Sequence, residues 1–193
     1  IFGTHFATLD IRQDSRVHQG IIDDILTKKS GLEIEKISEE EKLNWLLNTD
    51  LVLDPNDFEG ITKDTLENIN NIKNIQKRNG ERGMSRYIIS NSDHIKEVLN
   101  VFALFKLCGY QEEEINIDIV PLFETMEGLD AGENVMKELY NFPIYRRHVE
   151  RRGNEQTIML GFSDGTKDGG YLKANWEIYE TKEQLTKVSE DYG

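Results

Sequence analysis

The stretch TIMLGFSDGTKDGG, residues 157–170, runs from a short apolar segment into a loop that holds acidic residues, a lysine and several glycines. A helical pattern then begins near Tyr171. Glycine lets the backbone approach a ligand closely, and a helix N-terminus directs free N–H groups at an anion. Asp164 could hold a hard divalent cation, and Lys167 could neutralise a phosphate or carboxylate. Stretches rich in Asp and Gly also form plain surface turns, but the order of strand, charged loop and helix favours an active-site loop.

Working outward, the chain contains four segments that we interpret as buried strands: His5–Ile11, Met84–Ser90, Asn116–Phe123 and Gln156–Phe162. They are rich in β-branched and aromatic residues and show little strict alternation, which is typical of a parallel sheet covered on both faces. Apolar residues at helical spacing follow each strand, at 17–25, 95–105, 135–139 and 172–185, and a short helix is expected after Pro143. We interpret all of these stripes as core packing. Repeated βα units predict an α/β fold with a parallel sheet.

A long connection separates the first two predicted strands. Ser38 and Glu41 have capping-box spacing before an apolar run, and a second helical stripe includes Leu66 and Ile75. The segment Asp54–Asp57 contains a proline and breaks the two helices apart. We therefore predict a helical insertion over residues 31–81.

Charged residues follow the predicted strands at the point where each one ends. Arg12, Glu124 and Asp164 each come just after an apolar run. Half of a (β/α)-barrel and an open doubly wound sheet have the same periodicity, but barrels collect their chemistry on the carboxyl face of the strands, which favours the barrel. Two carboxylates suit Mg²⁺ or Mn²⁺. Taken singly, however, each acid could be a solvated loop residue or a helix cap, and Arg12 could pair with Asp10 or Asp14.

The composition limits the possible partners. The 193 residues fit one domain, and the formal net charge of −13 disfavours binding to nucleic acid or to an anionic membrane. No apolar run is long enough to cross a bilayer. A single cysteine, Cys108, excludes an internal disulfide and favours the cytoplasm; it lies in an apolar helical pattern, so we expect inert packing.

The remaining candidate residues have plain structural interpretations. The four histidines, His5, His18, His94 and His148, do not have a metal-ligand spacing. The basic run over residues 146–152 alternates with acidic and aromatic residues, so we expect a solvated helix face, with anion or subunit contact as the alternative.

Three segments carry a family resemblance. The run IMLGFSDGTKDGG (158–170) resembles the IMLGYSDS-x-KDGG motif of phosphoenolpyruvate carboxylases, LDIRQDS (9–15) resembles their DIRQES, and VPLFET (120–125) resembles their PLFET. All three occur in the family's order, and the resemblance extends over the whole chain. Asp14 stands where the family has Glu, and Gly165 where it has Ser. Neither departure replaces a charged ligand, so they bear on fine positioning.

The resemblance implies a fold, a reaction and a set of roles. It implies that residues 1–193 are a single fragment of a larger (β/α)-barrel catalytic domain, about half of the barrel. The implied enzyme is a cytoplasmic lyase that joins phosphoenolpyruvate and bicarbonate to give oxaloacetate and phosphate. Glu124 and Asp164 match the metal ligands for Mg²⁺ or Mn²⁺. Arg12 and Lys167 match catalytic, substrate-binding residues, with Lys167 at the substrate's phosphate. Gly169 matches a substrate-binding residue in the same loop.

The resemblance also indicates what is missing. Family members need a histidine upstream of this region and an HGRGGS loop downstream, and neither occurs here. The ends at Ile1 and Gly193 resemble cuts between elements, so we expect an inactive fragment. Alternatives are another metal-dependent barrel enzyme acting on phosphoenolpyruvate or a keto acid, and a catalytically dead binding module. Because four parallel strands leave open edges, we also expect a homo-oligomer.

Overall fold

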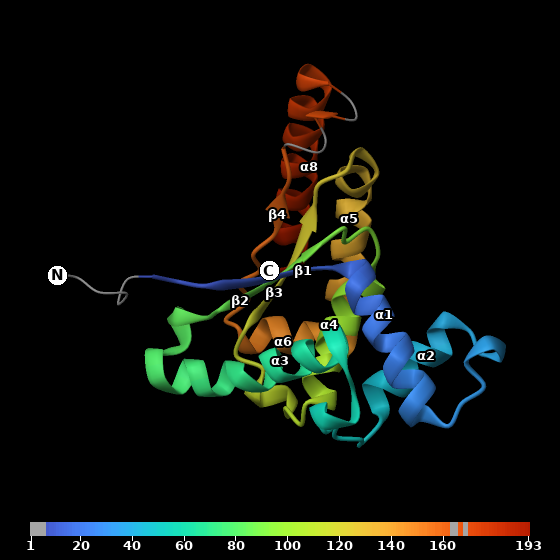
Figure 1. Cartoon of the computed structure of the whole chain (residues 1–193). Coiled ribbons are helices and arrows are strands. Elements are labelled where there is room, and N and C mark those ends of the chain that lie inside the picture. Colours follow the sequence, from blue (N-terminus) through green and yellow to red (C-terminus); the bar gives the residue numbers. More distant parts are fainter. Residues whose placement is uncertain (1–6, 163–165, 168–169) are drawn as a thin grey trace.

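The fold is built on a four-stranded parallel sheet (Figure 1). The computed structural model describes residues 7–162, 166–167 and 170–193. The strands, in sheet order, are β1 (Asp10–Asp14), β2 (Arg86–Ser90), β3 (Asp118–Phe123) and β4 (Met159–Leu160). All three neighbouring pairs are parallel. The α/β class and the parallel sheet predicted from the sequence are therefore confirmed.

Helices connect the strands. They are α1 (Ser15–Ile25), which continues as a π-helical turn (Leu26–Ser30), α2 (Glu39–Asn48), α3 (Gly60–Asn79), α4 (Ile95–Leu107), α5 (Met126–Asn141), α6 (Pro143–Arg151) and α8 (Tyr171–Tyr192). Residues 31–81 hold α2 and α3. The capping box at the start of α2 is present as predicted: the Ser38 hydroxyl accepts from the backbone N–H of Glu41, whose carboxylate accepts from the Ser38 N–H. None of the helices within the described ranges is long and apolar enough to cross a membrane.

The two faces of the sheet have different surroundings. Alternate residues of the strands, among them Tyr87, Ile119 and Phe123, join the side chains of the helices in one large core. Their neighbours Ile88, Val120 and Leu122 point the other way and form a separate cluster of strand residues alone. The helices thus cover one face, and the opposite face, called here the inner face, carries its own small apolar layer.

The first and last strands differ from the predicted ranges. β1 begins at Asp10 and continues to Asp14, so Arg12 lies at the centre of the strand, paired with Ile88, and not beyond its end. The physical reason is that β1 is an edge strand with partly exposed residues, and polar side chains are accepted there. The start of the predicted strand, His5–Phe6, lies outside the described residues. β4 is only two residues long, and the chain bends at Phe162.

The apolar stripe of α8 is the second departure. The helix packs on α5 through a face that includes Ala174, Leu185 and Val188, all buried. The stripe predicted to face the core is instead largely exposed: Leu172 is 83% exposed, Trp176 58% and Tyr179 53%. The interpretation of this stripe as core packing is wrong for its first half, because the helix has one packed face and the aromatic residues lie on another.

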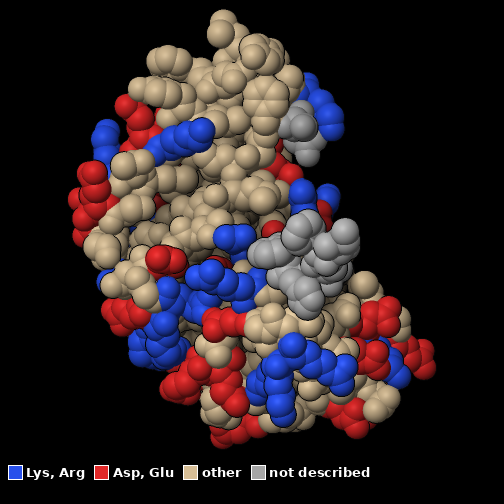
Figure 2. All heavy atoms as spheres, turned by 90° about the vertical axis from the view of Figure 1, so that its left-hand side faces the viewer, with Lys and Arg blue, Asp and Glu red and all other residues tan. Residues whose placement is uncertain are grey.

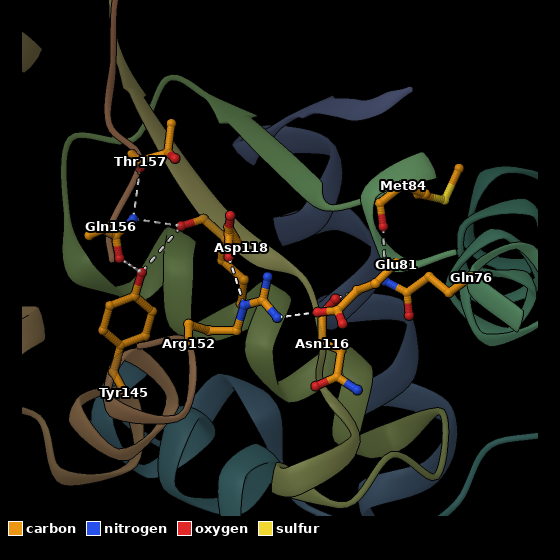
Figure 3. A network of polar contacts seen from close by, with 10 residues as sticks. Gln76, Glu81, Met84, Asn116, Asp118, Tyr145, Arg152, Gln156 and Thr157 are labelled. Atoms are coloured by element: carbon orange, nitrogen blue, oxygen red, sulfur yellow. Dashed lines mark hydrogen bonds and ion pairs between the residues drawn. The ribbon is translucent and has the colours of Figure 1, made fainter. Parts of the chain in front are cut away.

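At the amino ends of the strands, polar groups fasten the connections to the sheet (Figure 3). Arg152, just after α6, donates from Nε to Oδ1 of Asp118 at 2.8 Å and also pairs with Glu81. The half-buried guanidinium therefore joins the start of β3 to the 3₁₀ turn that precedes β2. This ion-pair cluster is distant in the fold from the loops at the carboxyl ends, and we interpret it as structural.

A glutamine of α3 takes part in the same network. Gln76 of α3 donates from Nε2 to the backbone carbonyls of Met84 at 2.8 Å and Asn116 at 2.7 Å (Figure 3). These residues precede β2 and β3. Buried or half-buried carbonyls need such partners, so α3 is tied directly to the beginnings of two strands.

Candidate active site at the carboxyl ends of the strands

Two of the predicted site residues meet over the inner face. Arg12 of β1 and Glu124, directly after β3, form an ion pair in which Nη2 lies 3.2 Å from Oε2. Arg12 is in register with Ile88 and Val120, both of the inner-face cluster, so its side chain projects to that side of the sheet. The Arg12 side chain crosses over β2 to reach Glu124. From the sequence, Asp10 or Asp14 could have paired with Arg12, but the acid in this ion pair is Glu124.

A pocket of about 200 Å³ lies around this ion pair. Its walls combine the arginine and the acid with apolar side chains and a glycine: Arg12, Leu122, Glu124, Met159, Leu160, Gly161 and Phe162. A guanidinium presents a planar fork of donors that matches carboxylate and phosphate oxygens. The pocket therefore offers one cation and one carboxylate at a site sized for a small anion.

Gly161 sits directly against Glu124. A Cβ added at Gly161 would lie 2.4 Å from the Cβ of Glu124 and 2.9 Å from its Cα. The backbone N–H of Gly161 also donates to the carbonyl of Phe123 at 2.8 Å. We expected the glycines of this stretch to let the backbone approach a ligand. Gly161 instead lets the end of β4 approach the residue that follows β3. The signal available in the sequence was a glycine interrupting the apolar run before the acidic loop.

The motif loop is described only in part. Asp164 and Gly169 lie outside the described residues, so the predicted sharing of one cation by Glu124 and Asp164 stays a prediction. Thr166 and Lys167 form a helical turn, in which the N–H and hydroxyl of Thr166 donate to the carbonyl of Phe162 at 3.1 and 2.8 Å. Lys167 is exposed.

The ends of this loop are held together by two rings. Phe162 and Tyr171 pack edge to face with their ring centroids 5.8 Å apart. Gly170 has a φ of 79°, a left-handed conformation that glycine adopts readily, and it precedes the first residue of α8. The residues on either side of the loop, Phe162 and Tyr171, are therefore held close together.

The described residues supply part of a binding site for a hard divalent cation. Glu124 supplies carboxylate oxygens at the carboxyl edge of the sheet, and Mg²⁺ commonly takes one or two carboxylates and keeps water in its other positions. Within the described ranges no group of three or more His, Cys, Asp or Glu side chains gathers as a metal site. The second carboxylate expected from the sequence is Asp164, outside those ranges.

Asp14, which replaces the family's glutamate, has a structural partner. It accepts from the backbone N–H of Arg16 at 2.9 Å, and the Arg16 guanidinium donates to both of its oxygens, at 2.9 and 2.7 Å. These hydrogen bonds lower the pKa of the Asp14 carboxyl. Asp14 therefore caps α1, and Arg16 is a second arginine at this edge that sequence analysis did not single out.

Asp93, in the loop after β2, is another acid that sequence analysis missed. Its Oδ1 is buried without a hydrogen-bond partner in the described part of the chain, and burial raises the pKa of this carboxyl. A Cβ added at Gly128, in the first turn of α5, would lie 2.5 Å from that oxygen. The carboxyl thus lies against the start of the helix that follows Glu124.

His18, His148 and Cys108 have structural environments. His18 is buried with Nε2 2.8 Å from the Tyr87 hydroxyl, and His148 packs edge to face on Phe102. Burial lowers the pKa of both imidazoles to about 4. Burial raises the pKa of the Cys108 thiol to about 12, which agrees with inert packing.

The basic run of α6 is neutralised by acids. Arg147 and Arg151 both pair with Glu112, at 3.1 and 3.3 Å, and Arg146 pairs with Glu150 at 3.0 Å. These pairs support the interpretation as a solvated helix face and leave no concentration of free positive charge there among the described side chains.

Comparison with known proteins identifies the family of this chain. The fold and site define an α/β protein with a parallel sheet in which an arginine in the middle of the first strand pairs with a carboxylate directly after the third. The family profile described as phosphoenolpyruvate carboxylase matches residues 1–193, and the chain belongs to that family. The phosphoenolpyruvate carboxylase of Nitrosomonas europaea is 35% identical over 204 residues, and that of Nitrosomonas eutropha is 34% identical over 204 residues. Each match covers 100% of this chain and 22% of the relative, so the chain spans about a fifth of their length.

Proposed function

We propose that this chain carries part of the active site of a phosphoenolpyruvate carboxylase, on about half of a (β/α)-barrel. The observation that supports the barrel is the sheet order β1-β2-β3-β4, with sequential neighbours and the helical core on one face. A doubly wound sheet reverses its order and has helices on both faces. A barrel also leaves its inner face for a layer of side chains, which is the position of Ile88, Val120 and Leu122.

The ion pair between Arg12 and Glu124 is the observation that carries the functional proposal. In the proposed reaction an oxygen of bicarbonate attacks the phosphorus of phosphoenolpyruvate, and the enolate of pyruvate leaves. The resulting carboxyphosphate separates into carbon dioxide and phosphate, and the enolate carbon attacks carbon dioxide to give oxaloacetate. Both substrates are anions, so the site must hold them together against their mutual repulsion.

Each residue has a defined part in this proposal. Arg12 binds an anionic group of bicarbonate or phosphoenolpyruvate through its planar fork, and Lys167 neutralises the phosphate region. Gly169 lets the loop backbone approach the substrate. Glu124 and Asp164 hold Mg²⁺ or Mn²⁺, which when bound offsets negative charge on the enolate and phosphate oxygens. The ion pair with Glu124 holds the guanidinium of Arg12 beside the pocket.

The chain by itself is expected to be inactive, because the family's upstream histidine and downstream HGRGGS loop are not in it and catalytic groups act as a unit. Purified chain supplied with magnesium, bicarbonate and phosphoenolpyruvate should produce no oxaloacetate above a mock purification. Steady production would contradict this expectation.

The proposed roles are tested in a longer protein that contains this segment. Asp164→Asn and Lys167→Ala should each reduce kcat/KM by about 10²-fold or more with unchanged folding, since such groups stabilise charge in the transition state. Asp130→Asn and Lys182→Ala, on α5 and α8, are matched controls expected to change kcat/KM less than about twofold. Wild-type kinetics from Asp164→Asn and Lys167→Ala would refute the assignment.

We also propose a cytoplasmic, homo-oligomeric protein. The support for the cytoplasm is a single cysteine, whose thiol is inert through burial. The support for oligomers is the exposed edge of β1 and the exposed aromatic residues of α8.

A further inference from the structure

The ion pair between Arg12 and Glu124 is long and accessible. Nη2 of Arg12 donates to Oε2 of Glu124 at 3.2 Å, whereas charge-assisted hydrogen bonds of this kind are usually about 2.7–2.9 Å long. The guanidinium of Arg16, at the same edge of the sheet, donates to both oxygens of Asp14, at 2.9 and 2.7 Å. The Arg12 side chain is 55% exposed, and a guanidinium has five N–H donors. A ligand can therefore reach Arg12 and take the place of Glu124.

The charges of the pocket around this pair cancel. Among the described residues that line it, Arg12 carries one positive charge and Glu124 one negative charge. The other five lining residues are uncharged: Leu122, Met159, Leu160, Gly161 and Phe162. Charges interact more strongly beside apolar walls than in water. An anion that approaches Arg12 is therefore repelled by Glu124, and a cation that approaches Glu124 is repelled by Arg12.

The overall charge of the chain gives an anion no general attraction. The formal net charge is −13, so the summed field of the chain repels anions. On the face drawn in Figure 2, Lys and Arg side chains lie among Asp and Glu over the lower half, and the upper half carries few charged side chains. Anion binding at the pocket therefore depends on whether the guanidinium of Arg12 is available.

The backbone keeps both partners in place. Arg12 lies at the centre of β1, and Glu124 directly follows β3. Gly161 packs so closely against Glu124 that a Cβ added to the glycine would lie 2.9 Å from the Cα of Glu124. Because the backbone on this side is packed, the Glu124 carboxylate stays within reach of Arg12. A change of partner requires rotation of the side chains alone.

We propose that Glu124 competes with anionic ligands for Arg12, so that an anion with a phosphate or carboxylate group binds the guanidinium tightly only when a divalent cation holds the Glu124 carboxylate. The role of Glu124 as a cation ligand rests on the proposed function. With both ligands bound, one internal ion pair is replaced by two contacts between opposite charges, guanidinium with anion and carboxylate with cation. Thermodynamic linkage makes the effect reciprocal, so the anion raises the affinity for the cation by the same factor.

Anion binding without divalent cations tests the proposal, in a longer protein that contains this segment. The probe is 2-phosphoglycolate, an unreactive anion with a phosphate and a carboxylate, titrated by calorimetry after the protein has passed over a chelating resin. Glu124→Gln should lower the Kd by about three- to tenfold, because the competing charge is lost while the side chain keeps its size. Unchanged or weaker binding by a folded Glu124→Gln variant would overturn the proposal.

The matched control for this variant is Asp14→Asn. It also removes one negative charge at this edge of the sheet, but from an acid that is paired with Arg16. Asparagine caps helices as well as aspartate does, so the start of α1 should persist. Asp14→Asn should change the Kd for 2-phosphoglycolate by less than about twofold. Tightening equal to that of Glu124→Gln would show a general effect of charge and would overturn the competition for Arg12.

Cation binding tests the other partner and gives an answer if Glu124→Gln fails to fold. Without added anion, Arg12→Met should tighten Mn²⁺ binding by about three- to tenfold, measured from the free Mn²⁺ signal in electron paramagnetic resonance. Arg16→Met should change it by less than about twofold. Mn²⁺ affinity that Arg12→Met leaves unchanged or weakens would refute the competition alone. Failure of the unchanged protein to bind Mn²⁺ would refute the proposed cation site and this inference together.

Discussion

Arg12 and Glu124 are 112 residues apart in the chain, and their side chains meet at 3.2 Å over the inner face of the sheet. One comes from the centre of an edge strand and the other from the residue after a buried strand. The local backbone around Arg12 and that around Glu124 form independently of one another. The contact between the two side chains therefore results from the parallel register of β1, β2 and β3. The ion pair therefore forms only when β1 and β3 are correctly placed in the sheet.

Replacing Arg12 should separate function from stability. The Arg12 side chain is 55% exposed, so its ion pair is expected to contribute less than about 1 kcal/mol to the free energy of unfolding. Arg12→Met should leave the urea midpoint of the longer protein nearly unchanged while lowering kcat/KM by about 10²-fold or more, because a bidentate anion contact is lost.

The matched control for Arg12 is Arg16, which lies at the same edge and is paired with Asp14. Arg16→Met should change kcat/KM by less than about threefold. Equal losses of activity in both variants would show that general positive charge at the edge matters, and not the position of Arg12.

Gly161→Ala should destabilise the chain. The new methyl group would lie 2.4 Å from the Cβ of Glu124, so the end of β3 or β4 must shift. Overpacking of this kind costs about 1–3 kcal/mol. Urea denaturation measures the loss, and the shift of Glu124 should also weaken Mn²⁺ binding in the longer protein.

Gly20 offers a control for the same substitution. It lies within α1, and a Cβ added there would meet no atom within 4 Å. Gly20→Ala should raise the free energy of unfolding by about 0.5–1 kcal/mol, because alanine favours helix. A stabilising Gly161→Ala would contradict the close approach of β4 to Glu124.

The ion pairs of two arginines in the α6 region should have different effects on stability. The Arg152 side chain is 19% exposed and pairs with Asp118 and Glu81, whereas that of Arg147 is 50% exposed and pairs with Glu112. Arg152→Met should cost about 2 kcal/mol in the free energy of unfolding because it leaves half-buried acids unpaired, and Arg147→Met should cost less than about 1 kcal/mol. Chemical denaturation of both variants compares them directly, and equal losses would argue against a structural role for the network in Figure 3.

Protonation of His18 should destabilise the chain at acidic pH. Burial lowers its pKa from 6.5 to about 4 in the folded state, so between these values the unfolded state binds more protons. Above about pH 6.5, titration of His18 does not change the free energy of unfolding. As the pH falls to about 4, it lowers the free energy of unfolding by an amount that grows to on the order of 3 kcal/mol. Urea denaturation between pH 7 and 4 should show a smaller loss for His18→Gln than for the unchanged chain. An unchanged pH slope would contradict the buried, neutral state.

Much of the fold was predictable because its signals are local. Apolar runs predicted four parallel strands, and Ser38 with Glu41 predicted the start of α2 from spacing alone. The limits of β1 were not predictable, because an edge strand accepts polar residues such as Arg12. The change from apolar to polar residues therefore does not mark where the strand ends. The exposure of Trp176 was missed for a related reason: periodicity shows that a helix face is apolar, but not what covers it.

The candidate site was predictable from motifs more than from physical pattern. Motif resemblance selected Arg12 and Glu124, and their contact agrees with a shared site. The close approach of Gly161 and the buried oxygen of Asp93 depend on which segments fold together, and no local spacing indicates that. The roles of all five residues, Arg12, Glu124, Asp164, Lys167 and Gly169, stay predictions.

The long connection between β1 and β2 has a consequence for the order of folding. Ser15 bonds to Asn91 across 76 positions of sequence, and α2 and α3 occupy much of the interval. Closing so long a loop costs more entropy than forming the nearer pairs of β2 with β3 and of β3 with β4. During synthesis β1 emerges first, yet it should dock last, after Gln76 has tied α3 to the starts of its neighbours. The arginine of the site would then arrive only when the rest of the sheet is already assembled.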